Sequence, residues 1–152
     1  MLTTSPHRVP PSSLDLLDRS RDSLVAAVTA STAGERYVAA HLGALRAAAA
    51  VLSVRGRPHR AGRPRSVWEV LPAVAPELGE WAIFFDAGAS RRAAIEAGRD
   101  DVVSSREADD LVRDGEAFLV VVEQLLGLPR HHVLPPGAVS LRPGPGVLPL
   151  SG

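Results

Sequence analysis

The stretch AGERYVAAHLGALRAAAAVLSV, residues 33–54, decides the fold because it is apolar on nearly every side of a helix. Val38, Leu42, Leu45, Ala49 and Leu52 recur at helical spacing and predict one apolar stripe. Alanine fills much of the remaining circumference. Since a helix that is apolar all round is usually buried, we predict a central helix that several neighbours approach closely.

Helix starts, including that of this stretch, are indicated by a Ser or Thr followed three residues later by an acid. The pairs are Ser12/Asp15, Thr32/Glu35, Ser66/Glu69 and Ser104/Glu107. In the last three pairs the Glu side chain can reach back to the amide of the cap residue, as in a reciprocal capping box. Pro76 suits a fifth start, because a first helical position does not need its missing N–H.

Apolar spacing then predicts the remaining helices. They cover about residues 13–28, 66–74, 76–97 and 105–126, with Gly98 and Gly127 as stops. The apolar positions of the helix at 13–28 are Leu14, Leu17, Leu24, Val25 and Val28. Those of the helix at 76–97 are Leu78, Trp81, Ala82, Phe85 and Ile95. Those of the helix at 105–126 are Ala108, Leu111, Val112, Gly115, Phe118, Leu119, Val122, Leu125 and Leu126. No segment alternates apolar and polar residues for long, so we expect an all-α antiparallel bundle of four longer helices and one short helix.

Length and composition fit one domain. We expect a flexible N-terminal segment at 1–11, the bundle at 12–127 and a Pro/Gly-rich disordered tail at 128–152. Cysteine is absent, which excludes disulfides and thiolate chemistry and favours a cytoplasmic location. The first residues do not resemble a secretory signal, and no run of eighteen apolar residues predicts a membrane span. The formal net charge is zero, so any attraction for nucleic acid or a membrane has to be local.

The segment from Arg55 to Arg65 is a candidate phosphate-binding loop, because guanidinium groups make bidentate contacts with phosphate oxygens. Its arginines are Arg55, Arg57, Arg60, Arg63 and Arg65, and it contains no acid. The alternative is a solvated loop in a chain whose 17 basic residues are all arginine. No aromatic residue is interleaved to stack on bases, as in many single-strand binders.

Two further sets of charged residues lie on later helices. Arg91 and Arg92 could line a partner groove, or Arg92 could lie along the bundle and pair with an acid. Asp110 and Asp114, four residues apart, could face a groove together, although acids near a helix start are also favoured by the helix dipole. No histidine lies near them to complete a usual ligand set, and we expect no metal and no cofactor.

Arg36 and His41 are separated by four residues in the central helix. Residues five positions apart on one helix point about 140° away from each other, at roughly 100° per residue. They could therefore form one catalytic site only if a kink or a second subunit brought them together. We expect His41 to be packed or partly buried.

Three segments carry a family resemblance: ERYVAAHLGALRAAAAVL, RPRSVWEVLPAVAPELGEWAIFFDAGASRRAAIEAG and SSREADDLVRDGEAFLVVVEQLL. They resemble a small actinobacterial group within the HEPN superfamily, over about residues 12–126. The resemblance implies a helical bundle, commonly a homodimer, often found beside nucleotidyltransferase-type protein partners. It also implies an alternative activity, since many members are ribonucleases that use an Arg, four to six residues, then His, with the histidine as acid or base and the arginine on the phosphate.

In the ribonuclease members of the superfamily the Arg–His motif typically lies in the later helices, whereas Arg36 and His41 belong to the second predicted helix. The leading hypothesis is therefore a non-catalytic module that associates with nucleic acid, nucleotides or a protein partner. The alternative is a metal-independent, toxin-type endoribonuclease that uses Arg36 and His41 on RNA. A third hypothesis is an interaction subunit whose apolar groove takes a partner helix.

Overall fold

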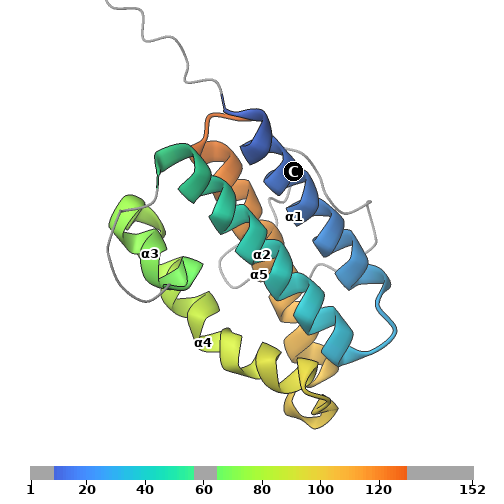
Figure 1. Cartoon of the computed structure of the whole chain (residues 1–152). Helices are drawn as coiled ribbons and strands as arrows, with labels where there is room; N and C mark the ends of the chain where they lie inside the picture. The colour runs from blue at the N-terminus through green and yellow to red at the C-terminus, as the bar shows by residue number, and fades with distance from the viewer. Residues whose placement is uncertain (1–8, 57–64, 130–152) are drawn as a thin grey trace, which may run out of the picture.

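The computed structural model describes residues 9–56 and 65–129. The helices are α1 (Pro11–Thr29), α2 (Ala33–Arg55), α3 (Val67–Val74), α4 (Gly79–Glu96) and α5 (Ser105–Leu125), with 3-10 turns at Pro76–Leu78 and Asp100–Val102. α1, α2 and α5 run side by side, and α3 and α4 lie along one flank of α2 (Figure 1). The described residues contain no strand, so the predicted all-α bundle of four longer helices and one short helix is confirmed.

Three of the predicted helix caps are formed. Thr32 and Ser66 accept hydrogen bonds from the amides of Glu35 and Glu69, and Ser104 and Glu107 make the complete capping box of α5. The predicted start at Ser12 is wrong. α1 begins two residues before the predicted residue 13, at Pro11, because a proline in the first turn needs no hydrogen-bond acceptor for its nitrogen.

The fourth long helix also begins differently from the prediction. Pro76 starts a 3-10 turn that ends at Leu78, and the α-helix itself begins at Gly79. The predicted stops at Gly98 and Gly127 are confirmed, since both glycines adopt a positive φ, of 97° and 72°, directly after helix ends.

One half of the bundle, formed by α1, α2 and α5, is packed through small residues. Leu24 of α1 fills the space that glycines leave on both other helices: a Cβ at Gly43 or at Gly115 would lie 3.0 Å from its side chain. Ser20 of α1 donates a hydrogen bond of 2.7 Å to the carbonyl of Gly43. Because these positions have little or no side chain, the three backbones approach closely.

The predicted stripe of α2 is not its most buried side. Of the predicted stripe Leu52 is buried, but Val38, Leu42 and Leu45 are only partly buried, whereas the alanines Ala40, Ala44, Ala47 and Ala48 are fully buried. The close approach of α1 and α5 explains this difference, because it favours the smallest side chains at the centre. In α1, likewise, Leu14 and Val25 are exposed, while Leu17, Leu24 and the serines Ser13, Ser20 and Ser23 are buried.

The other half of the bundle, around α3 and α4, is packed through aromatic rings. Phe118 of α5 contacts Trp68 of α3 and both Trp81 and Phe85 of α4, with ring centroids 5.1–6.1 Å apart. Rings of this size hold the helix axes farther apart than glycine and alanine do. On α5, the predicted apolar positions from Ala108 to Val122 are buried, with the addition of Glu123, which forms an ion pair of 2.9 Å with Arg21.

By length and composition alone, α2 could cross a membrane, contrary to the exclusion made from the sequence. In the structure it is the core helix, with buried residues from Gly34 to Leu52 that face the other helices.

Candidate functional site

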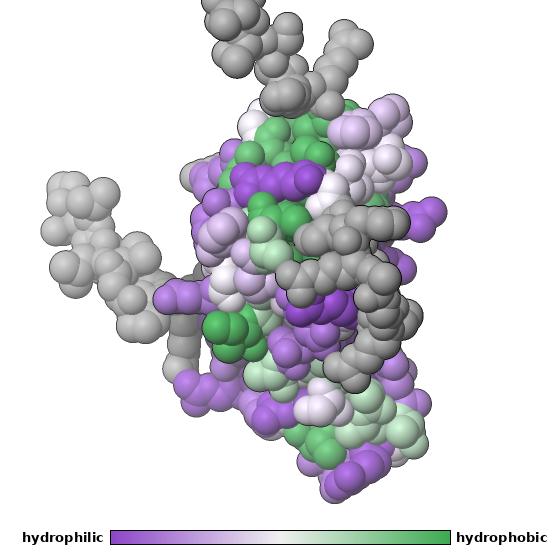
Figure 2. All heavy atoms as spheres, turned by 60° about the vertical axis from the view of Figure 1, so that its left-hand side comes forward, coloured by the Kyte–Doolittle hydropathy of each residue, from purple (hydrophilic) through white to green (hydrophobic). Residues whose placement is uncertain are grey.

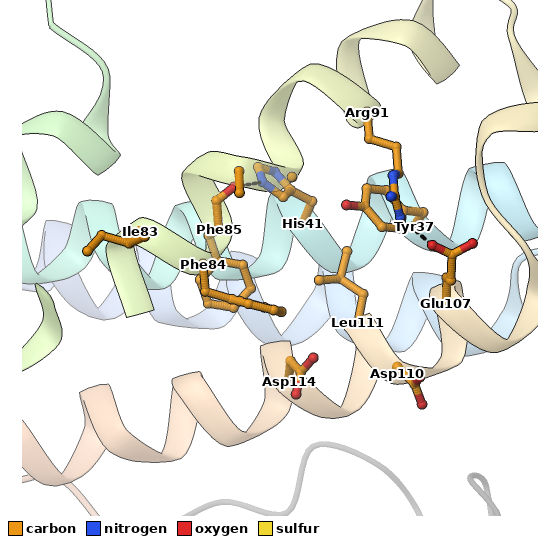
Figure 3. Close-up of a pocket in the computed structure, with 12 residues that line it drawn as sticks. Tyr37, His41, Ile83, Phe84, Phe85, Arg91, Glu107, Asp110, Leu111 and Asp114 are labelled. Carbon is orange, nitrogen blue, oxygen red and sulfur yellow. Dashed lines mark hydrogen bonds and ion pairs between the residues drawn. The ribbon is translucent and has the colours of Figure 1, made fainter. Parts of the chain in front are cut away.

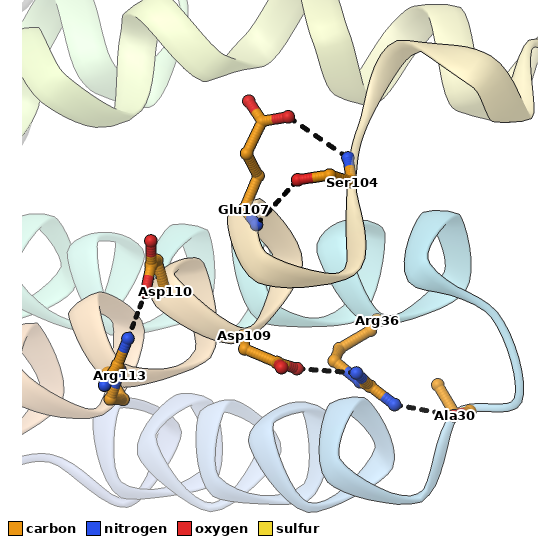
Figure 4. Close-up of polar contacts among 7 residues, drawn as sticks. All are labelled: Ala30, Arg36, Ser104, Glu107, Asp109, Asp110 and Arg113. Atoms are coloured by element: carbon orange, nitrogen blue, oxygen red, sulfur yellow. Dashed lines mark hydrogen bonds and ion pairs between the residues drawn. The ribbon is translucent and has the colours of Figure 1, made fainter. Parts of the chain in front are cut away.

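Arg36 lies at the start of α2 and is used in contacts within the bundle. Its Nη1 donates to Oδ1 of Asp109 on α5 at 2.5 Å, and its Nη2 donates to the carbonyl of Ala30 at 3.4 Å (Figure 4). Through these two contacts Arg36 connects the turn between α1 and α2 to the first turns of α5.

His41 is buried, with 1% of its surface exposed, as expected from the sequence. Its Nε2 lies 2.8 Å from the carbonyl of Phe85, and its Nδ1 lies 3.2 Å from Nη1 of Arg92. A carbonyl only accepts and a guanidinium only donates, so Nε2 carries the proton and Nδ1 accepts. Burial lowers the pKa of His41, the Phe85 carbonyl opposes this, and the charge of Arg92 lowers the pKa further. The ring is therefore neutral, with both nitrogens occupied.

The structure does not bring Arg36 and His41 together within one chain. Arg36 turns toward α5 and Asp109, whereas His41 turns toward α4 and Phe85. The arginine that reaches His41 is Arg92, which the sequence placed near a groove or an acid. Arg92 also lies 3.5 Å from Glu96 through its Nε, as an ion pair without a hydrogen bond.

Arg91, the neighbouring arginine, crosses from α4 to the start of α5. It forms an ion pair with Glu107 and lies over the ring of Tyr37, 5.9 Å from the centroid (Figure 3). Glu107 thus has two partners, because its other oxygen accepts from the amide of Ser104. The Ser104 amide and hydroxyl, followed by Arg91, hold the pKa of Glu107 below its usual value.

A groove of about 460 Å³ opens between α4 and α5 beside this ion pair. Tyr37 and His41 of α2 form its floor. One wall comes from α4 and the other from α5. The wall residues are Ile83, Phe84, Phe85, Ala87, Gly88 and Arg91 on α4, and Glu107, Asp110, Leu111 and Asp114 on α5.

Gly88 shapes the floor of the groove. A Cβ at this position would lie 2.7 Å from the hydroxyl oxygen of Tyr37, so a side chain there would collide with the phenol. Burial raises the pKa of Tyr37, so the phenol stays protonated at neutral pH and offers an O–H at the floor.

The α4 wall is apolar and open to solvent. Ile83 is 72% exposed and Phe84 is 46% exposed. On the face that carries α3 and α4, apolar surface lies among charged residues (Figure 2). An exposed apolar patch bordered by polar residues is typical of a binding surface.

The α5 wall supplies carboxylates. Asp110 is paired with Arg113, one turn along the same helix (Figure 4). Asp114 is half-buried, and within the described ranges no side chain donates a hydrogen bond to it or forms an ion pair with it. Burial, followed by the nearby charge of Asp110, raises the pKa of Asp114, and the charge of Arg113 opposes this effect.

The candidate phosphate-binding loop is only partly described. Arg55 pairs with Glu77 and donates to the carbonyl of Val74 at 3.0 Å, and Arg65 lies 3.8 Å from Glu69. Both described arginines therefore already have acidic partners. Arg57, Arg60 and Arg63 lie outside the described residues.

The family model of SAV_6107-like HEPN domains matches residues 27–123. The chain belongs to the HEPN superfamily. This match spans α2 to α5 almost completely and includes every residue of the groove. Neither the curated proteins nor the solved structures contain a significant match to this HEPN domain.

Sequence reasoning found part of the groove of this HEPN domain. It singled out His41, Arg91, Asp110 and Asp114, which all line the groove, and Arg92, which does not belong to the lining. It missed Ile83 and Phe84, although the run AIFFD places more apolar residues in succession than one helix face can bury. It also missed the contact between His41 and Arg92, which are 51 positions apart and lie on different helices.

Proposed function

We propose that this HEPN domain is a non-catalytic module that binds a partner protein in the groove between α4 and α5. The observation that carries the proposal is the state of His41, which is neutral, buried and bonded through both ring nitrogens. An acid or base for attack by an RNA 2′-hydroxyl has to be within hydrogen-bond reach of the reacting group, and buried His41 offers no free nitrogen.

The charges of the groove favour a protein partner over a nucleic acid. Its lining carries the carboxylates of Glu107, Asp110 and Asp114 against the single guanidinium of Arg91. Arg91 and Arg113 pair with Glu107 and Asp110, so a phosphate would meet the remaining carboxylate of Asp114, whereas the exposed apolar wall at Ile83 and Phe84 gains from burial against a partner. The family resemblance adds a nucleotidyltransferase-type protein as a candidate partner and a homodimer as the expected assembly.

An RNA cleavage assay tests the non-catalytic part of the proposal. Structured and single-stranded RNA are incubated with the protein in EDTA, and we expect the RNA to stay intact. Cleavage by the wild type that is lost in both Arg36→Ala and His41→Ala, and kept in Arg46→Ala, contradicts the proposal. Arg46 is a matched control because it lies on α2 and contacts α1 through Ser23 instead of the groove.

RNA binding at low salt tests the choice between nucleic acid and protein. We expect no binding in fluorescence anisotropy at low ionic strength. Binding with a steep salt dependence that is lost when Arg57, Arg60 and Arg63 are neutralised supports the nucleic-acid hypothesis instead.

A further inference from the structure

Asp114 is the carboxylate of the groove that forms no ion pair with a described side chain, although the charge of Arg113 acts on it from the neighbouring position. The other charged pairs of the lining are complete, since Arg91 pairs with Glu107 and Asp110 pairs with Arg113. Among the described side chains none forms an ion pair with Asp114, although it is half-buried. A carboxylate that is partly removed from water gains from an incoming cation more than a fully solvated one does.

An apolar surface lies across the groove from this carboxylate. Phe84 projects from α4 toward Asp114 on α5, and Ile83 lies farther along the same apolar wall (Figure 3). Both apolar side chains keep much of their surface in water. A ligand that contacts both the apolar wall of α4 and the carboxylate of Asp114 therefore has a cation and an apolar group close together.

The raised pKa of Asp114 agrees with this geometry. Burial and the charge of Asp110 disfavour the ionised form in the free protein, and the charge of Arg113 offsets them only in part. A cation placed beside the carboxylate reverses this effect, and the protein binds it more tightly as a result.

We propose that the groove takes a segment of a partner protein that carries an arginine or lysine beside an apolar side chain, with the cation on Asp114 and the apolar group on Phe84 and Ile83. The inference rests on the proposed partner-binding function and adds the chemistry of the occupant. Charge complementarity selects this occupant, because an acidic segment would meet an unneutralised carboxylate.

The experiment uses small probes that differ only in charge, titrated into the ¹⁵N-labelled full chain and followed by NMR. Phenethylguanidinium carries the cation and a phenyl ring, phenethylurea is its nearly isosteric neutral counterpart, and 3-phenylpropionate carries a negative charge. We expect the guanidinium probe to shift the amides of Phe84, Leu111 and Asp114 and to bind about five-fold more tightly than the urea. The carboxylate probe is expected to bind most weakly.

Two variants test whether Asp114 causes the tighter binding of the guanidinium probe. In Asp114→Asn we expect the guanidinium and urea probes to bind equally, with the urea affinity unchanged. Asp109→Asn is the matched control, because it removes the same charge from α5 at a residue that pairs with Arg36 outside the groove. It should keep the five-fold preference. A well-dispersed spectrum of Asp114→Asn checks that the variant is folded.

The proposal is overturned if no probe binds the wild type, if the urea binds as tightly as the guanidinium, or if the preference survives in Asp114→Asn. Sedimentation of the free protein supplies a further test: a dimer that dissociates on Phe84→Glu makes a second copy the occupant and also overturns the proposal. RNA cleavage would defeat the non-catalytic function and leave the probe preference intact, so the two failures are distinguishable.

Discussion

The two halves of this HEPN domain are packed by opposite means. In the half formed by α1, α2 and α5, glycines and alanines let the backbones meet, and Leu24 fills the remaining space between Gly43 and Gly115. In the half formed by α3 and α4, aromatic rings separate α4 from α5, and a groove with exposed apolar residues remains. The comparison suggests that the first half supplies stability and the second half supplies a surface for binding.

Leu24→Ala should produce the largest loss of stability. Leu24 is fully buried, and its truncation leaves a cavity between three helices, at a cost of about 3 kcal/mol. Phe84→Ala, in the groove, is the matched truncation of an apolar residue and should cost about 1 kcal/mol or less because Phe84 is already 46% exposed. Urea denaturation of both variants measures the difference. Equal losses would show that the groove is part of the stabilising core.

His41 should make stability depend on pH. Its pKa is lowered in the folded state, so below the usual value of 6.5 the unfolded chain binds more protons than the folded chain. The contribution of His41 is therefore complete above about pH 6.5 and is lost as the pH falls toward the folded pKa, with a slope of at most about 1.4 kcal/mol per pH unit.

His41→Gln is the variant for this prediction, because it keeps a polar side chain near Phe85 and Arg92 without a titrating group. The difference between wild type and variant in unfolding free energy should shrink from pH 7.5 to pH 5. A difference that stays constant over this range would contradict the neutral, doubly bonded state of the ring.

Asp114→Asn should raise stability slightly, in contrast to the losses expected for buried positions. The folded state raises the pKa of Asp114, so ionisation opposes folding once the pH exceeds the usual value of 3.8. Removing the charge should gain a few tenths of a kcal/mol at pH 7, after allowance for solvent screening. Thermal unfolding at pH 7 and at pH 3 measures the gain, which should vanish at the lower pH. A loss of stability at pH 7 would show that the carboxylate has a structural role.

Arg91→Ala and Arg36→Ala should have the smallest effects on global stability, because exposed ion pairs contribute about 0–1 kcal/mol. Their local effects should differ. Arg36 joins helices that small residues already hold together, whereas Arg91 joins α4 to α5 beside the groove. Hydrogen exchange should therefore speed up along the C-terminal half of α4 in Arg91→Ala only. If the amides of α4 exchange equally slowly in both variants, the aromatic contacts alone hold α4 in place against α5.

The sequence predicted the elements of the fold well because caps and periodicity are local. Thr32, Ser66 and Ser104 act as caps, and the buried face of α5 follows its apolar spacing. Burial in α1 and α2 was predicted less well. Periodicity identifies the more apolar side of a helix, but close packing selects the smallest side chains, and Leu14 and Val25 are exposed while Ser20 is buried.

The candidate site was predictable only in part, because it depends on how helices cross. Asp110 and Asp114 were placed on one face of a helix by their spacing, and both line the groove. The partner of His41 could not be found in this way, because Arg92 reaches it from another helix. The separation of Arg36 from His41 was predictable, since it follows from helix geometry alone.

Glu107 belongs to two structures at once. One of its oxygens completes the cap of α5 on the amide of Ser104, and the other binds Arg91 at the end of the groove. Fraying of the first turn of α5 therefore releases Arg91 from this end. The N-terminal cap of α5 and the ion pair that joins α4 to α5 are therefore coupled through one carboxylate.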